Sequence, residues 1–126
     1  SHQLPVRPEY CVEVKNVSEN NEEAIRGLLM QKDRPTAILV SDDILAVSLE
    51  RVCLENHLAI PEDLSIIGYN NSMLVSCCDP ELTSIDNKLE TLCQHLITTL
   101  MGVLEGNEMP KKTVFSGELV KRGTTK

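Results

Sequence analysis

Two short apolar runs, separated by a segment with helical spacing, constrain the fold of this chain more than any other feature. The runs are residues 37–40 and 64–69. Both have strand length and little polar alternation, which is typical of strands buried on both faces of a sheet. After residues 41–43, the apolar residues at helical spacing are Leu45, Leu49, Val52 and Cys53. Strand, helix and strand in this order predict an α/β lobe with a parallel sheet.

The flanking segments extend this pattern. Asn20 and Glu23 form a capping pair, which predicts a helix that ends at residues 33–35. We interpret residues 70–80 as a loop. The further segments with strand composition are residues 10–14, 82–85 and 113–120.

The strongest periodicity covers residues 88–105. Apolar residues recur there in steps of three and four, which predicts one amphipathic helix, and Gly106 follows as its C-terminal stop. The stripe consists of Leu89, Leu92, Cys93, Leu96, Ile97, Leu100, Met101 and Leu104. Leaving such a stripe in water is costly. We therefore expect this helix either to fold back on its own sheet or to pair with a second copy of the chain in a homodimer.

The charge balance argues against nucleic-acid binding by these residues. The chain has 126 residues, and its 12 basic and 19 acidic side chains give a net charge of −7. The basic residues are dispersed, and an acidic surface repels phosphate backbones. We therefore expect any DNA-binding part of the protein to lie elsewhere. No apolar run approaches the roughly 18 residues of a membrane span, so we expect no membrane contact.

The cysteines and histidines form no metal-binding pattern. The five cysteines lack CxxC spacing, and the three histidines lie far apart in the sequence. We interpret the cysteines as reduced thiols of a cytoplasmic protein, with a redox-sensitive pair at Cys77–Cys78 as the alternative. We expect neither a metal nor a cofactor.

Polar residues follow both apolar runs. Asp42 and Asp43 follow the first run, and Asn70 and Asn71 follow the second. Each pair also has a purely structural explanation, since aspartates cap helices and asparagines tolerate turns. The carboxyl ends of parallel strands meet at one edge of a sheet, where ligands of α/β proteins bind. Because carboxylates and amides together accept and donate hydrogen bonds, we interpret all four residues as ligand-binding, with sugar hydroxyls as suitable partners.

No motif in the sequence indicates catalysis. There is no nucleophile elbow, Walker loop or GxGxxG motif, and no Ser, His and Asp spacing that implies a triad. Asp42 and Asp43 do not fit a glycosidase, whose two carboxylates face each other across the scissile bond at about 5–9 Å. We therefore expect a binding protein and not an enzyme.

From Arg34 onward, an ordered set of short motifs resembles the C-terminal third of the LacI/GalR (lactose-repressor) family of transcriptional regulators. The set runs through Pro35–Ile38, Ser41–Ala46, Ile60–Asn71, Leu82–Ile85 and Leu119–Thr125. Each motif is weak alone, but their order is specific. The combination of Asn70–Ser72 with Thr83–Asp86 is more similar to the maltose-type regulators.

This resemblance implies a periplasmic-binding-protein-like (type I) fold, in which a small sugar or oligosaccharide effector binds between two α/β lobes. Effector binding would control operator binding allosterically. Residues 10–84 would form most of the three-layer C-terminal lobe, and the helix at 88–105 would belong to the other lobe. Residues 1–126 would then be the C-terminal part of the effector-binding domain. The helix-turn-helix and most of the N-terminal lobe would be absent, so we expect an incomplete fragment.

The chain departs from the family pattern at the two polar clusters. The family's usual Asn-Asp is Asp42–Asp43 here, and its usual Asp after the Gly-aromatic pair is Asn70. An amide and a carboxylate have thus exchanged places between the two clusters, and the hydrogen-bonding groups are retained, so sugar binding is still expected while the particular sugar stays open. Asn16 lies near the position of an aromatic residue that often stacks on the ligand. The alternative function is a sugar-binding protein of a transport system, against which the cysteines and the Pro61–Ser65 motif argue.

Overall fold

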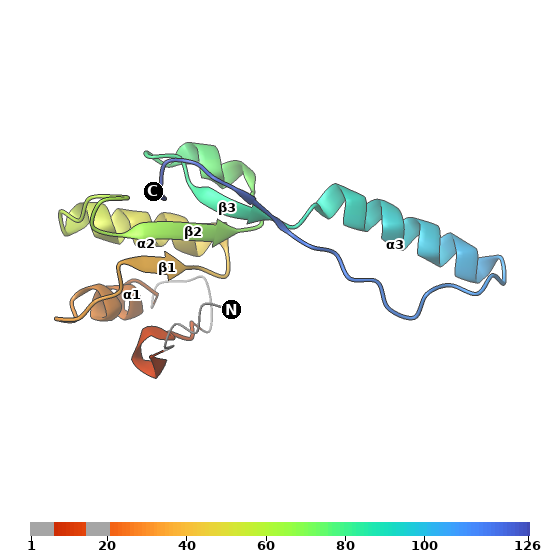
Figure 1. Cartoon of the computed structure of the whole chain (residues 1–126), viewed down its shortest axis with the longest axis horizontal. Coiled ribbons are helices and arrows are strands. Elements are labelled where there is room, and N and C mark those ends of the chain that lie inside the picture. Colours follow the sequence, from red (N-terminus) through yellow and green to blue (C-terminus); the bar gives the residue numbers. More distant parts are fainter. Residues whose placement is uncertain (1–6, 15–20) are drawn as a thin grey trace.

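A small sheet and the helices that accompany it make up the computed structural model, which describes residues 7–14 and 21–126 (Figure 1). The strands are β1 (Ala37–Leu39), β2 (Ser65–Tyr69), β3 (Thr83–Asp86) and β4 (Glu118–Val120). The α-helices are α1 (Asn21–Leu29), α2 (Asp43–Glu55) and α3 (Leu89–Leu104). Two short 3-10 helices are η1 (Pro8–Tyr10) and η2 (Met73–Cys77).

The sheet has the order β1-β2-β3-β4. Both β1 and β3 pair in parallel with β2, whereas β4 pairs antiparallel with β3. Helix α2 connects β1 to β2, as expected for a crossover between parallel strands. The predicted α/β class with parallel pairing is therefore confirmed. The carboxyl ends of β1, β2 and β3 lie at the same edge of the sheet.

The hydrophobic core lies between one face of the sheet and helices α1 and α2. Val52 of α2 and Ile66 of β2 are fully buried in it. The prediction that both apolar runs are buried on both faces is wrong for the described residues, because Leu39 is 66% exposed. Leu39 pairs with Ile67, and successive side chains of a strand point to opposite faces, so both lie on the face away from Ile66 and α2.

The N-terminal part of the described chain contains the predicted helix, which ends at Leu29 and not at residues 33–35, but it lacks the predicted strand. Helix α1 is present, with Leu28 and Leu29 buried, while Asn20 and Asn16 lie outside the described residues. The predicted strand at residues 10–14 is wrong, because η1 ends at Tyr10 and residues 11–14 have no regular secondary structure. Pro8 opens a turn here, and its carbonyl accepts a hydrogen bond from the backbone N–H of Cys11 (3.0 Å).

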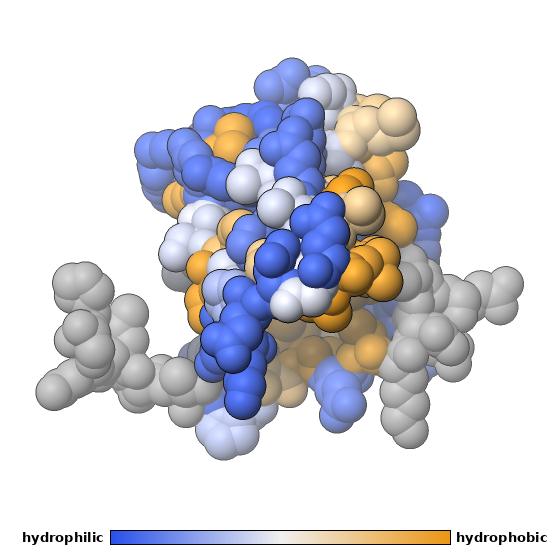
Figure 2. Space-filling view, turned by 90° about the vertical axis from the view of Figure 1, so that its right-hand side faces the viewer, coloured by the Kyte–Doolittle hydropathy of each residue, from blue (hydrophilic) through white to orange (hydrophobic). Residues whose placement is uncertain are grey.

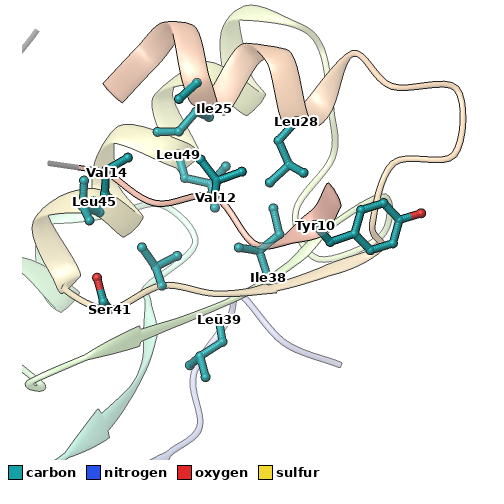
Figure 3. Close-up of a pocket in the computed structure, with 12 residues that line it drawn as sticks. Tyr10, Val12, Val14, Ile25, Leu28, Ile38, Leu39, Ser41, Leu45 and Leu49 are labelled. Carbon is teal, nitrogen blue, oxygen red and sulfur yellow. The ribbon is translucent and has the colours of Figure 1, made fainter. Parts of the chain in front are cut away.

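Residues 11–14 pass β1 without joining the sheet, and an apolar cavity remains between them (Figure 3). Its volume is about 170 Å³. Val12 and Val14 line it on one side, and Leu28 of α1 and Ile38 of β1 line it from other directions. The cavity therefore lies between residues 10–14, helices α1 and α2, and β1.

The C-terminal strand is shorter than predicted, because only Glu118–Val120 of the expected residues 113–120 form β4. Their partners are Ser84–Asp86 of β3. Strand β3 ends at Asp86, so residues 113–117 have no neighbouring strand with which to pair. In the loop predicted at residues 70–80, the structure places η2, whose Val75 is buried in the core.

Helix α3 confirms the periodicity of residues 88–105 but projects away from the sheet (Figure 1). The expectation that it folds back on its own sheet is therefore wrong. The return segment, residues 105–117, packs on one side of it, where Gly102 is buried and an added Cβ would lie 2.6 Å from Met109 Sδ. Figure 2, viewed from the end that α3 occupies, shows hydrophobic residues gathered along one side. The exposed ones on α3 are Leu89, Leu96, Ile97, Leu100, Met101, Val103 and Leu104.

No helix in the described part of the chain is long and apolar enough to cross a membrane.

Candidate functional site at the strand ends

Asp42 and Asn70 meet at the carboxyl edge of the sheet, after β1 and β2. Asn70 Nδ2 donates a hydrogen bond to Asp42 Oδ2 (3.0 Å). The other carboxylate oxygen of Asp42 accepts from the backbone N–H of Ile44 (2.8 Å) and so caps α2. Asp42 therefore performs the structural role and also presents one oxygen at the edge of the sheet.

A third side chain, Asn87, extends this pair beyond β3. Asn87 Nδ2 donates to Asn70 Oδ1 (3.1 Å), so Asp42, Asn70 and Asn87 form a row across the ends of β1, β2 and β3. Asn70 itself has a positive φ of 102°, a conformation that asparagine tolerates better than most residues. The row combines carboxylate and amide groups, which bind ligands that both donate and accept hydrogen bonds.

Asp43 lies inside the protein directly behind this row. It is 1% exposed, and its two oxygens accept from Ser84 Oγ (2.6 Å) and from the backbone N–H of Ser72 (2.7 Å). Gly68 makes room for it, because an added Cβ at this position would lie 2.4 Å from Asp43 Oδ1. Asp43 thereby joins the start of α2 to β3 and to the loop after β2.

Asn71 is likewise engaged within the protein. Its Oδ1 accepts from Arg122 Nη2 (2.8 Å), and its Nδ2 donates to Asp86 Oδ2 (3.2 Å). Its backbone N–H donates to Ser84 Oγ (3.0 Å). Arg122 also donates through Nη1 to the carbonyl of Leu82 (2.9 Å), which ties the C-terminal segment to the residue before β3.

The structure thus brings the four residues predicted from the sequence to one edge of the sheet. Asp42 and Asn70 present polar atoms there, while Asp43 and Asn71 hold the neighbouring segments in place. The sequence reasoning missed Asp86 and Asn87. They follow the predicted strand at residues 82–85, so the same rule of polar residues after a strand could have found them.

A groove of about 610 Å³ opens beside the row, between the loop after β2 and the start of α3. Its lining carries two carboxylates, Asp86 and Glu90, and one ammonium group, that of Lys88. Lys88 Nζ forms an ion pair with Glu118 Oε2 (3.0 Å). Together with Asp42, these groups make the described side of the site net negative.

None of the cysteines lines this groove. Burial, together with the adjacent Glu50 carboxyl, raises the pKa of the Cys78 thiol to about 12. Burial also raises the pKa of Cys53 to about 11. Such thiols stay protonated near neutral pH, which makes them poor nucleophiles and poor metal ligands. The described residues contain no group of three or more His, Cys, Asp or Glu side chains that could hold a metal ion.

Comparison with known proteins assigns the fold to a family. Residues 1–125 match the periplasmic binding protein-like domain. The chain belongs to this family. A helix-turn-helix-type transcriptional regulator from Lachnoclostridium phytofermentans is 42% identical over 125 residues, which cover 99% of this chain and 38% of that protein. The transcriptional repressor PurR from Yersinia pestis is 32% identical over 120 residues, which cover 94% of this chain and 35% of that protein.

Solved structures agree with this assignment. A LacI family transcriptional regulator from Bifidobacterium animalis superposes with a TM-score of 0.79 at 27% identity, over 83% of this chain and 39% of that one. The lac repressor dimer bound to operator and an anti-inducer gives a TM-score of 0.77 at 30% identity, over 83% of this chain and 37% of that one. The chain is therefore a periplasmic-binding-protein-like domain of the LacI type, and it spans less than two fifths of the length of these relatives.

Proposed function

We propose that this chain is the effector-sensing part of a bacterial transcriptional regulator and that a small sugar binds at the carboxyl ends of its strands. The observation that carries the proposal is the row of Asp42, Asn70 and Asn87, joined by hydrogen bonds of 3.0 and 3.1 Å across three strand ends. This edge is where open α/β sheets bind ligands.

The chemistry of the row suits neighbouring hydroxyl groups. A sugar hydroxyl donates one hydrogen bond and accepts others, and the carboxylate of Asp42 accepts while the amides of Asn70 and Asn87 do both. The net negative character of Asp42, Asp86 and Glu90 favours a neutral ligand over a phosphorylated one. We assign ligand contact to Asp42, Asn70 and Asn87, and the positioning of these groups to Asp43 and Asn71.

In the intact regulator, the sugar would lie between this lobe and a second lobe to which α3 belongs. A ligand that contacts both lobes favours one arrangement of them over another, which is the physical basis of an allosteric response. We infer that this response changes operator binding by a helix-turn-helix outside the present chain. We further infer a cytoplasmic homodimer, the assembly suited to a two-fold symmetric operator.

Isothermal titration of the intact regulator with mono- and disaccharides, lactose and maltose among them, tests the proposal. In the same regulator, Asp42→Ala and Asn70→Ala are expected to weaken binding by roughly 1–3 kcal/mol, because each leaves polar partners unsatisfied. Asp43→Ala should weaken it by a similar amount, through loss of site geometry. Glu62→Ala, which removes an exposed carboxylate in the turn before β2, is the matched control and should leave affinity unchanged.

Operator binding is measured in parallel by mobility shift with and without the sugar that binds. The proposal requires the sugar to change operator affinity. Absence of binding to every sugar tested, or wild-type affinity in both the Asp42 and the Asn70 variants, would overturn it.

A further inference from the structure

In the described structure, two connectors join helix α3 to the sheet. Side-chain hydrogen bonds and an ion pair gather at the connector that precedes α3. The first connector is residues 87–88 after β3, and the second is the return segment that leads into β4 (Figure 1). The relative placement of α3 and the sheet is therefore set where these connectors leave the sheet. Asp86, the last residue of β3, lies at this point.

The carboxylate of Asp86 accepts one hydrogen bond from the connector before α3 and one from the loop after β2. Its Oδ1 accepts from the backbone N–H of Lys88 (2.7 Å), and its Oδ2 accepts from Asn71 Nδ2 (3.2 Å). Lys88 is the residue before α3 and has a left-handed conformation, with φ of 53° and ψ of 50°. That conformation is unfavourable for a residue with a side chain, so the contact with Asp86 supports it directly.

The second connector passes Asp86 at close range. An added Cβ at Gly117 would lie 3.2 Å from the Asp86 carbonyl oxygen and 2.8 Å from Ile85 Cγ2, so this passage depends on glycine. The ion pair between Lys88 and Glu118 joins the two connectors to each other. The backbone around Asp86 is thereby confined on both sides.

On the sheet side, Asn71 connects Asp86 to the site. Asn71 follows Asn70 directly, and Ser84 links its backbone N–H to buried Asp43. Any change in the loop after β2 that moves Asn71 therefore acts on one oxygen of Asp86, while the other oxygen holds the first residue before α3.

We propose that Asp86 is a positioning residue that couples the strand-end site to the placement of α3. It acts through two hydrogen bonds, one to Asn71 and one to the backbone of Lys88. Its regulatory meaning rests on the proposed function, in which a ligand at Asn70 shifts the arrangement of the two lobes. The link itself is a property of this chain without any ligand.

The test measures the distance between two spin labels on the 126-residue chain. Cys77 in η2 and a Gln94→Cys substitution on α3, outside its apolar stripe, are both exposed and take the labels, and Cys11→Ser and Cys93→Ser remove the other exposed thiols. Cys53 and Cys78 react slowly because their pKa values are raised to about 11 and about 12. An excess of unlabelled chain suppresses distances between copies.

Asp86→Asn is the decisive variant, because the remaining carbonyl still accepts from Lys88 while the new NH₂ group faces the NH₂ group of Asn71. We expect Asp86→Asn and Asn71→Ala each to shift the label distance beyond the width of the starting distribution. Asp86→Ala, which removes both contacts, should shift it at least as far. Glu108→Ala removes an exposed carboxylate in the return segment, outside the groove, and should leave the distance unchanged.

A shift in Asp86→Ala alone, with none in Asp86→Asn and Asn71→Ala, would show a local helix cap and overturn the coupling. Unchanged distances in all variants would overturn it as well. Far-ultraviolet circular dichroism checks the fold, and if Asp86→Ala unfolds, the other two variants carry the test. Failure of the intact regulator to bind any sugar would refute the proposed function but not this link, so the two failures are distinguishable.

Discussion

The uncovered side of α3 leads to the prediction that the 126-residue chain self-associates. Seven apolar side chains of this helix are more than half exposed, from Met101 at 51% to Leu104 at 71%. The return segment packs against the side that bears Gly102 and His95, so it leaves these seven side chains in solvent. We therefore expect a dimer or a larger assembly with α3 at the contact.

The magnitude follows from the area that pairing would cover. A fully buried Leu contributes about 1.5–3 kcal/mol, so covering the exposed part of Leu96 or Leu100 contributes roughly 1–2 kcal/mol each. A symmetric dimer contains both residues twice, which makes their joint contribution about 4–8 kcal/mol. Each 1.4 kcal/mol is tenfold in affinity, so the double substitution Leu96→Glu/Leu100→Glu should weaken association by about a thousandfold or more.

Light scattering at high micromolar chain concentration measures this association. We expect the unsubstituted chain to be dimeric or larger and Leu96→Glu/Leu100→Glu to be monomeric with its circular dichroism retained. Leu54→Glu is the matched control, because Leu54 is 77% exposed on α2, outside the α3 contact. A monomeric unsubstituted chain would refute the reasoning, and so would a folded double variant that remains dimeric.

Three further predictions concern the sheet and its charges. Gly68→Ala should destabilise the fold by roughly 1–3 kcal/mol, because the added Cβ would lie 2.4 Å from Asp43 Oδ1 and 2.9 Å from Leu82 Cδ2. Urea unfolding measures this loss, and an unchanged midpoint would contradict the steric argument. Burial raises the pKa of Glu50 in the folded chain. At pH values between the pKa of Glu50 in the unfolded chain and its higher pKa in the folded chain, the folded chain therefore binds more protons. The free energy of unfolding falls as pH rises through this range. Glu50→Gln should therefore raise Tm at pH 7 but not below roughly pH 4, and an equal gain at both pH values would contradict the titration argument. The chain alone, at net charge −7, should show no sequence-specific DNA binding in a mobility-shift assay at physiological salt, and submicromolar operator binding would contradict this expectation.

Elements with a strong local pattern were predictable from the sequence. Helix α3 is predicted by the helical spacing of apolar residues from Leu89 to Leu104. Strands β1 and β2 are predicted by the continuous apolar runs that precede Asp42 and Asn70. Residues 10–14 had only a weak pattern. Whether such a segment forms a strand depends on its pairing with the edge of a neighbouring strand. In this chain the segment begins with the turn at Pro8, and residues 11–14 have no regular secondary structure.

The candidate site divides in the same way. Polar residues after parallel strands predicted that Asp42, Asp43, Asn70 and Asn71 would gather at one edge, because strand direction alone brings those ends together. Which of two adjacent aspartates turns inward depends on Ser84 and on the space left by Gly68, which are distant in sequence. No spacing rule contains that information.

Periodicity within the chain determined that residues 89–104 form an amphipathic helix, and two continuous apolar runs determined the two parallel strands that end in polar clusters. Only the tertiary structure decided that the helix leaves the sheet with its apolar side uncovered and that Asp86 holds its start. The physical reason is that hydrogen bonds within a helix join residues four apart, whereas the burial of its surface depends on where other segments of the fold are placed.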